Sequence, residues 1–197
     1  MTTQDEPPMQ NTSSPVKDAL DHFYTKFFKL VDEKGAPLVP YDSEWLSVCY
    51  LDDGKEGDDV RWLPKRQTQQ TDMFERLSEA LETPIHPDII DFYSHYWSDP
   101  ITANTAQGKL SLLQVWNNDD LERLRANFIG HALQKKRRRH PLTLFFALTL
   151  PDTEMMISVD NADGRIWVER PGKAPHLCVA DSLAEFINAL EPELTTA

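Results

Sequence analysis

Acids and histidines supply most acid–base and metal chemistry in proteins, and their spacing in this chain matches no catalytic motif. No two histidines stand four residues apart, and the helical zinc pattern His-Glu-x-x-His does not occur. The acids form adjacent pairs, whose side chains point apart on a strand and do not converge as acid–base catalysis requires. A phosphate-binding glycine loop and a Gly-x-Ser-x-Gly elbow are also missing from the sequence. We therefore expect no catalytic residue, no cofactor and no metal site. The acid pairs are Asp52 and Asp53, Asp58 and Asp59, and Asp119 and Asp120; the histidines are His22, His86, His95, His131, His140 and His176.

The balance of charge favours binding to a basic partner. The chain has 32 acidic residues against 20 Lys and Arg, a net charge of −12, and most of the acidic excess lies in residues 1–100. A field of this sign repels nucleic acid and attracts cationic surfaces, so we predict no nucleic-acid partner. The exception is a basic run that we interpret as a solvated helix end, with a minor lipid-headgroup contact as the alternative. The run consists of Lys135, Lys136, Arg137, Arg138 and Arg139.

Neither the apolar segments nor the cysteines indicate a membrane-spanning or secreted protein. The longest apolar run, Leu142 to Leu150, is much shorter than the roughly 20 residues that span a bilayer. The first ten residues contain no basic region followed by an apolar stretch, so we expect no signal peptide. Cys49 and Cys178 stand in apolar, strand-like segments, and we predict that both are reduced, buried thiols.

Helix-capping signals predict where the helices begin. Ser14-Pro15 provides an N-cap and a proline at the first helical position. The polar run at 117–120 (NNDD) caps a long helix and places two acids at its positive end. The segment 182–185 (SLAE) is a capping box, and His86 lies at the entry to a helix after a proline break. The predicted helices cover 15 to about 35, 71–81, 88–97, about 117–138 and 182–191.

Short apolar runs separated by turn residues predict antiparallel strands. The loop at 52–59 (DDGKEGDD) is expected to be a solvated hairpin tip. No repeat or linker divides the chain. We predict an α+β fold, a single domain over 15–192 with a mostly antiparallel sheet flanked by helices. Residues 1–14 and 193–197 are predicted to be tails, the first of them disordered. The predicted strands are 46–51, 60–63, 101–106, 109–116, 142–150, 155–159 and 165–170.

Three parts of the chain resemble the Syd family of SecY-interacting proteins. They are IHPDIIDFYSHYW (85–97), the segment KLSLLQVWNNDDLERLRANFIGHALQKKRRR (109–139), and a C-terminal group comprising LTLFFALTL, ISVDNADGRIWVE and SLAEFINALEP. The resemblance is strongest in LLQVWNNDDL and NFIGH and weaker before residue 84. A wider likeness, carried by the proline-aspartate element before Phe92, is to the SUKH superfamily and implies a SUKH-like fold.

The resemblance implies a non-enzymatic protein that is peripheral to the cytoplasmic side of the inner membrane. Such a protein binds SecY, prefers SecY that is not properly complexed, and so checks or negatively regulates the translocase. The binding surface implied is a concave acidic groove for basic cytoplasmic loops. Asp119 and Asp120 match the family's pattern. We predict further groove acids and two candidate aromatic anchors, for which burial in the core is the competing interpretation. The added acids are Asp88, Asp91, Asp160 and Glu169, and the anchors are Trp97 and Trp116.

Two alternatives remain open from the residues. The SUKH likeness also suits an immunity-type domain that neutralises a basic toxin such as a nuclease. Carboxylates from distant segments could also converge in a hydrolase cleft, although no motif indicates this.

Overall fold

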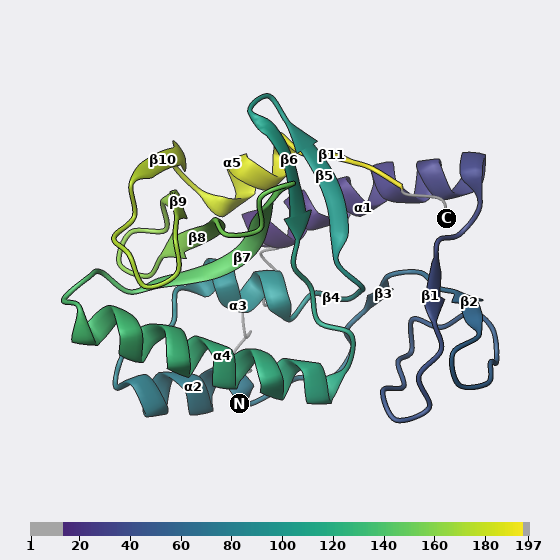
Figure 1. The fold of residues 1–197 in the computed structure, drawn as a ribbon, viewed down its shortest axis with the longest axis horizontal. Coiled ribbons are helices and arrows are strands. Elements are labelled where there is room, and N and C mark those ends of the chain that lie inside the picture. The colour runs from purple at the N-terminus through teal and green to yellow at the C-terminus, as the bar shows by residue number, and fades with distance from the viewer. Residues whose placement is uncertain (1–13, 195–197) are drawn as a thin grey trace, which may run out of the picture.

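The computed structural model describes residues 14–194 and confirms the α+β fold. Seven antiparallel strands form one curled sheet in the order β10-β9-β8-β7-β6-β5-β11, with helices packed around it (Figure 1). The helices are α1 (Pro15–Lys34), α2 (Met73–Leu81), α3 (Pro87–Tyr93), α4 (Asn118–Arg137) and α5 (Leu183–Asn188). The strands of this sheet are β5 (Ile101–Thr105), β6 (Gly108–Leu112), β7 (Thr143–Leu150), β8 (Met156–Asp160), β9 (Ile166–Glu169), β10 (Leu177–Ala180) and β11 (Glu191–Pro192).

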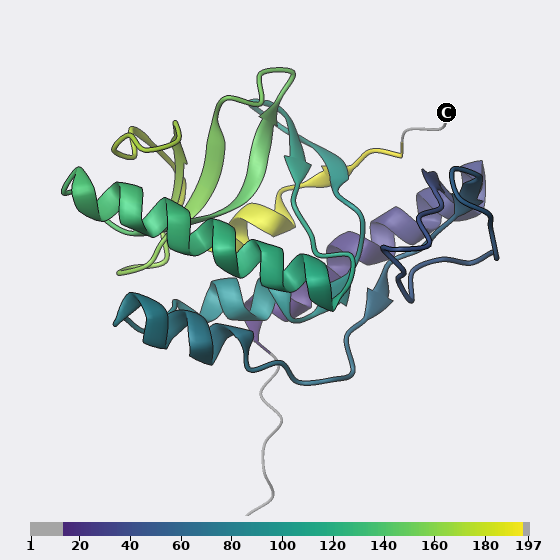
Figure 2. The same cartoon turned by 60° about the horizontal axis from the view of Figure 1, so that its bottom comes forward.

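Two small two-stranded sheets lie outside the main one. Strand β1 (Leu38–Pro40) pairs with β2 (Asp59–Arg61), and β3 (Lys65–Arg66) pairs with β4 (Tyr96–Trp97). Helices α4 and α2 lie side by side on one flank of the sheet, while α1 runs behind α5 (Figures 1 and 2). A single cluster of buried apolar and aromatic side chains joins α1, α3, α4 and the sheet.

The predicted caps are confirmed. The side chain of Ser14 accepts from Lys17 N, that of Asn117 from Asp120 N, and that of Ser182 from Glu185 N. The ring of His86 accepts from Asp88 N, which is the predicted helix-entry role. These interactions are local in sequence, so the pattern alone predicts them. The tail segments 1–13 and 195–197 lie outside the described residues, and the packed chain continues through Leu194, which is buried.

The segment before the acidic loop does not form the strand that we predicted at 46–51. Ser47 Oγ donates to Trp116 O at 2.6 Å and accepts from Cys49 N at 3.1 Å, so the backbone turns instead of extending. The expected pairing with 60–63 is present in part: an isolated bridge joins Tyr50 and Trp62, and Leu51 N donates to Arg61 O at 2.9 Å and Leu63 N to Cys49 O at 3.0 Å on either side of it. Strand β2 pairs mainly with β1, which the sequence did not indicate.

Two further predictions are corrected. The helix expected at 88–97 ends at Tyr93, because Gln67 Nε2 donates to both Tyr93 O and Tyr96 O at 2.9 Å and the chain then pairs as β4. Cys49 is buried as predicted, but Cys178 is exposed, because β10 is an edge strand of the sheet. Along residues 14–194, no helix has the length and apolar character needed to cross a bilayer.

Candidate partner-binding groove

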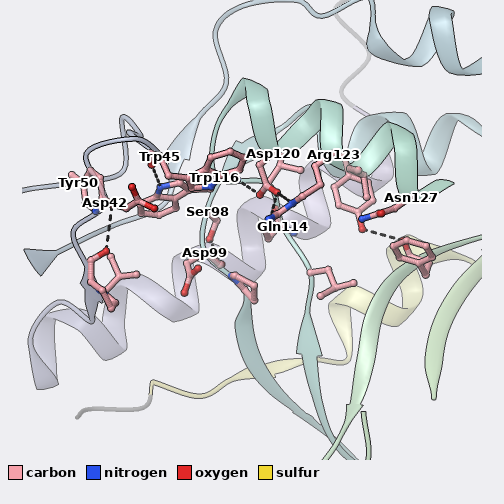
Figure 3. Close-up of a pocket in the computed structure, with 18 residues that line it drawn as sticks. Asp42, Trp45, Tyr50, Ser98, Asp99, Gln114, Trp116, Asp120, Arg123 and Asn127 are labelled. Atoms are coloured by element: carbon pink, nitrogen blue, oxygen red, sulfur yellow. Dashed lines mark hydrogen bonds and ion pairs between the residues drawn. The ribbon is translucent and has the colours of Figure 1, made fainter. Parts of the chain in front are cut away.

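A hollow of about 470 Å³ opens beside the start of α4 (Figure 3). Four segments line most of it: part of 39–50, the turn 98–100, the segment 113–116, and the face of α4 over 120–127. Tyr93 of α3 and Phe145 of β7 complete the lining. We call this hollow the groove. Its charged lining consists of three acids and one cation, Asp42, Asp99, Asp120 and Arg123. Aromatic rings form much of the remaining wall, so the groove combines an excess of negative charge with apolar contact area.

Backbone pairing brings the distant segments of the groove together. Trp97 and Val115 form a parallel bridge, and Ser98 N donates to Val115 O at 2.9 Å. This pairing holds Asp99, two residues beyond Trp97, next to the segment that leads into α4. Asp99 therefore lies in the groove wall beside the segment 113–116, which comes from a different part of the chain.

Asp120 stands at the beginning of α4 and joins the helix to the groove. Its Oδ2 accepts from Trp116 N at 2.9 Å, and its Oδ1 pairs with Arg123 Nη2 at 2.6 Å. The Arg123 guanidinium lies over the Trp45 ring, 5.2 Å from the ring centroid. Asp120 therefore fixes the chain before the helix and also holds a cation at the rim.

Asp99 is the most perturbed acid in the groove. Burial raises the pKa of its carboxyl to about 6, and the nearby charge of Asp120 adds to the shift. Both effects disfavour the ionised carboxylate. A cation bound beside Asp99 would favour its ionised form and so oppose both effects, which suits the groove to positively charged groups.

The loop that closes the groove is fastened to the start of α4. Trp116 Nε1 donates to Trp45 O at 3.0 Å, and Asn117 Nδ2 donates to Leu46 O at 2.9 Å. Trp116 also packs edge-on against Tyr50, with the ring centroids 5.1 Å apart. These contacts hold the Trp45 and Tyr50 rings in the wall of the groove.

Of the acids and tryptophans predicted as site residues, the structure brings Asp120 and Trp116 into the groove. Trp116 is largely buried, so it contributes a wall more than a protruding anchor. Asp119 is exposed at the start of α4. Trp97 lines a neighbouring hollow together with Leu46 and other residues.

The other predicted acids lie elsewhere. Asp91 on α3 pairs with Lys17 at 3.0 Å, and Asp88 on the same helix is partly buried, which raises the pKa of its carboxyl. Asp160 Oδ1 accepts from Ala162 N at 2.8 Å in the turn after β8. None of these three lines the groove. Within residues 14–194, no three Asp, Glu, His or Cys side chains gather as ligands of a metal would.

Glu169 is fully buried, so it does not lie on a partner-binding surface. It forms an ion pair with Lys135, which corrects our interpretation of Lys135 as part of a solvated helix end. Lys135 continues the inward stripe of α4 that contains Phe128 and His131, so its side chain enters the core. Thr143 Oγ1 donates to Glu169 Oε1 at 2.5 Å, and Lys135 Nζ donates to Lys173 O at 3.0 Å. The remaining basic residues, 136–139, are exposed.

Sequence reasoning missed most polar residues of the groove, among them Asp42, Asp99 and Gln114. Asp42 lies in a loop whose path depends on the pairing of β1 with β2. Asp99 precedes Pro100, a pair that signals a turn but gives no indication of function. Gln114 lies directly before Val115 and Trp116, within the segment that carries the resemblance, and its position there was the one available signal.

Comparison with known proteins gives consistent matches over most of the chain. A family model described as Syd protein (SUKH-2) matches residues 17–192. A relative named Protein Syd from Pseudoalteromonas atlantica (strain T6c / ATCC BAA-1087) is 42% identical over 186 residues, which cover 93% of this chain and 99% of the relative. Relatives of the same name from Alteromonas mediterranea and Hahella chejuensis are 39% and 41% identical over 173 and 163 residues. These two alignments cover 88% and 81% of this chain and 94% and 83% of the relatives.

Proposed function

This chain belongs to the Syd protein family (SUKH-2), and from that premise we propose that it is a regulatory protein that binds SecY. In this proposal, basic cytoplasmic loops of SecY bind in the groove beside the start of α4. The protein is then held at the cytoplasmic face of the inner membrane by its partner. It prefers SecY that is not properly complexed, and it checks or negatively regulates the translocase.

The single observation that carries this proposal is the placement of Asp42, Asp99 and Asp120 around one hollow. The three acids come from distant parts of the chain, yet they face a shared space that includes one cation, Arg123. Cytoplasmic loops of membrane proteins are enriched in Lys and Arg. Complementary charge of this kind accelerates encounter and selects the partner.

The aromatic wall supports a polypeptide partner in preference to a free ion. Trp45, Tyr50 and Trp116 line the groove. Aromatic side chains at an interface bury large areas at a small loss of conformational freedom. A segment that carries both cationic and apolar side chains would therefore match this groove better than a purely charged ligand. The proposal includes no catalytic step.

The exposed basic residues 136–139 lie at the opposite end of α4 from the groove. In the proposal, these residues make a minor contact with lipid headgroups while SecY provides the main attachment. Each basic residue near an anionic leaflet contributes about 1 kcal/mol. The contact is therefore secondary for a protein whose total charge is −12.

The proposal is tested by capture of SecY from detergent-extracted membranes on immobilised protein. We expect wild-type protein to retain SecY at low salt and a variant with Asp42→Asn and Asp99→Asn to retain much less. The matched control carries Glu79→Gln and Glu82→Gln, which removes two exposed charges from the C-terminal end of α2. Equal retention of SecY by both variants would contradict the assignment to the groove.

The immunity-type alternative predicts a different partner for the same groove. Its basic toxin would compete for the same acids, since the SUKH relationship and the acidic lining suit both partners. The same immobilised protein, exposed to extract that lacks SecY, distinguishes the two. Groove-dependent capture of a basic nuclease in place of SecY would favour the alternative.

A further inference from the structure

Gln114 carries a buried amide that is unpaired in the described part of the chain. The residue lies in the groove wall between β6 and α4, and it is 7% exposed. Neither its Oε1 nor its Nε2 has a hydrogen-bond partner within residues 14–194. Buried amides are nearly always hydrogen-bonded in folded proteins, because an unpaired one is costly. An unpaired amide beside a hollow is therefore expected to find its partner in a ligand.

Arg123 indicates which kind of group the walls of the groove hold. Its planar guanidinium lies over the Trp45 ring at 5.2 Å and pairs with Asp120 at 2.6 Å (Figure 3). The side chain is 65% exposed, so it occupies the rim and leaves the wall around Gln114 without a cation. One guanidinium is thus already held here by a ring face and a carboxylate.

Asp99 supplies a second carboxylate near the same wall. The bond from Ser98 N to Val115 O, at 2.9 Å, ties the Asp99 turn to the segment that includes Gln114. Asp99, Gln114 and Asp120 all line the same hollow. Gln114 and Asp99 therefore offer amide and carboxylate oxygens to one group.

On the premise that the groove binds a basic segment, we propose that its inner wall receives the guanidinium of one partner arginine, which donates to Gln114 Oε1 and to Asp99. Gln114 Nε2 then donates to a main-chain carbonyl of the same segment. A guanidinium has five donors in one plane and stacks on aromatic rings, whereas an ammonium is a strongly hydrated point charge. The pocket therefore selects arginine over lysine and defines one anchor residue in the partner.

The arginine pocket is tested by NMR titration of ¹⁵N-labelled wild-type protein with N-acetyl-arginine amide and N-acetyl-lysine amide. The Gln114 side-chain signal is the amide pair that is missing from the spectrum of Gln114→Met. We expect arginine amide to move this signal and to bind at least about fivefold more tightly than lysine amide. Equal binding of the two amides, with the Gln114 signal unmoved, would overturn the arginine pocket.

Peptides distinguish this pocket from the groove as a whole. Gln114→Met keeps the side-chain volume and removes the polar atoms. We therefore expect it to weaken the binding of an arginine-containing peptide about tenfold and to leave unchanged the binding of the same peptide with lysine in place of arginine. Gln107→Met, on the exposed turn between β5 and β6, is the matched control and should change neither. Should Gln114→Met not fold, the relative affinities of wild-type protein for the arginine and lysine amides decide, since they need no assignment of the Gln114 signal, and equal affinities would overturn the arginine pocket.

The outcomes separate the two proposals. Wild-type protein that bound both peptides equally, with no effect of Gln114→Met, would refute the arginine pocket and leave the acidic groove intact. Wild-type protein that bound neither peptide, nor SecY from membranes, would refute the proposed function and the pocket that depends on it.

Discussion

The carboxyl group of Asp99 titrates close to neutral pH, because burial and the Asp120 charge raise its pKa to about 6. Below that pH the groove loses one negative charge. We expect the affinity for a basic peptide to fall severalfold as the pH is lowered from about 7.5 to about 5.5, measured by fluorescence anisotropy. In Asp99→Asn the same pH change should have a much smaller effect. An unaltered pH dependence in that variant would contradict the assignment.

Asp99 also affects the stability of the fold, and its effect on stability has the opposite pH dependence to its effect on binding. Its folded-state pKa of about 6 lies above the unfolded value of roughly 4. Ionisation is therefore harder in the folded protein, and stability falls as the pH rises from roughly 4 to about 6. At pH 7, Asp99→Asn should raise the free energy of unfolding by about 1 to 2 kcal/mol. A residue kept for binding can destabilise the fold, whereas a residue kept for structure should stabilise it, so this expected result favours a binding role for Asp99.

Arg123 is an internal competitor for the groove acids. It pairs with Asp120 across one helical turn, and its side chain is mostly exposed, so the ion pair contributes little to stability. We expect Arg123→Gln to increase the affinity for a basic peptide about threefold, because it removes a positive charge from the binding surface. Arg125→Gln is the matched control, since Arg125 pairs with Glu122 outside the groove lining. Weaker binding by Arg123→Gln would show that the partner does not bring a cation to this point.

The ion pair of Lys135 and Glu169 is buried, and removing one partner leaves the other charge unpaired in the core. We expect Lys135→Met to lower the free energy of unfolding by about 3 to 5 kcal/mol in urea titrations. The double variant with Glu169→Met should recover at least half of the loss, since both charges are then absent. Lys136→Met, on the exposed side of the same helix turn, should stay within about 0.5 kcal/mol of wild type. A loss as large in Lys136→Met would exclude the buried pair as the cause.

At the level of elements, the start of α4 positions the groove. Asn117 Oδ1 accepts from Asp120 N at 2.8 Å, and its Nδ2 donates to Leu46 O at 2.9 Å, so one side chain caps the helix and fastens the loop. We expect Asn117→Ala to lower the free energy of unfolding by about 1 kcal/mol. Hydrogen exchange around Leu46 should also become faster. Asn118→Ala, at the exposed neighbouring position, should have neither effect.

The elements also show which features could be predicted from the sequence. The helix beginnings at Ser14, Asn117 and Ser182 depend on residues within one turn, so their signals are local. The hairpin of β5 and β6 is equally local. Within 36–72, β2 confirms most of the strand predicted at 60–63, but the strand predicted at 46–51 is wrong and β1 and β3 were not predicted. These strands pair with residues distant in sequence, and the turn at Ser47 depends on Trp116. The groove acids share this limit: Asp42, Asp99 and Asp120 meet through contacts that no local pattern encodes.

At the scale of the whole molecule, α4 separates two regions of opposite charge. The groove acids gather around its N-terminal end, and the exposed basic residues 136–139 lie at its C-terminal end. Twenty residues of helix extend about 30 Å, which exceeds the screening distance of roughly 8 Å at physiological salt. The two regions therefore act independently on a partner. A cationic loop would be drawn to one end, while anionic headgroups would meet the other.

This separation makes the salt dependence of binding informative about where the partner sits. Raising the salt from about 0.05 M to about 0.5 M shortens the screening distance from roughly 14 Å to roughly 4 Å. We expect the affinity for a basic SecY loop peptide to fall by about an order of magnitude over this range, with the change mainly in the association rate. Asp42→Asn with Asp99→Asn should flatten this dependence, whereas Glu79→Gln with Glu82→Gln should preserve it, although both variants have the same net charge. Equal flattening in both would mean that the overall charge of −12, and not the groove, attracts the partner.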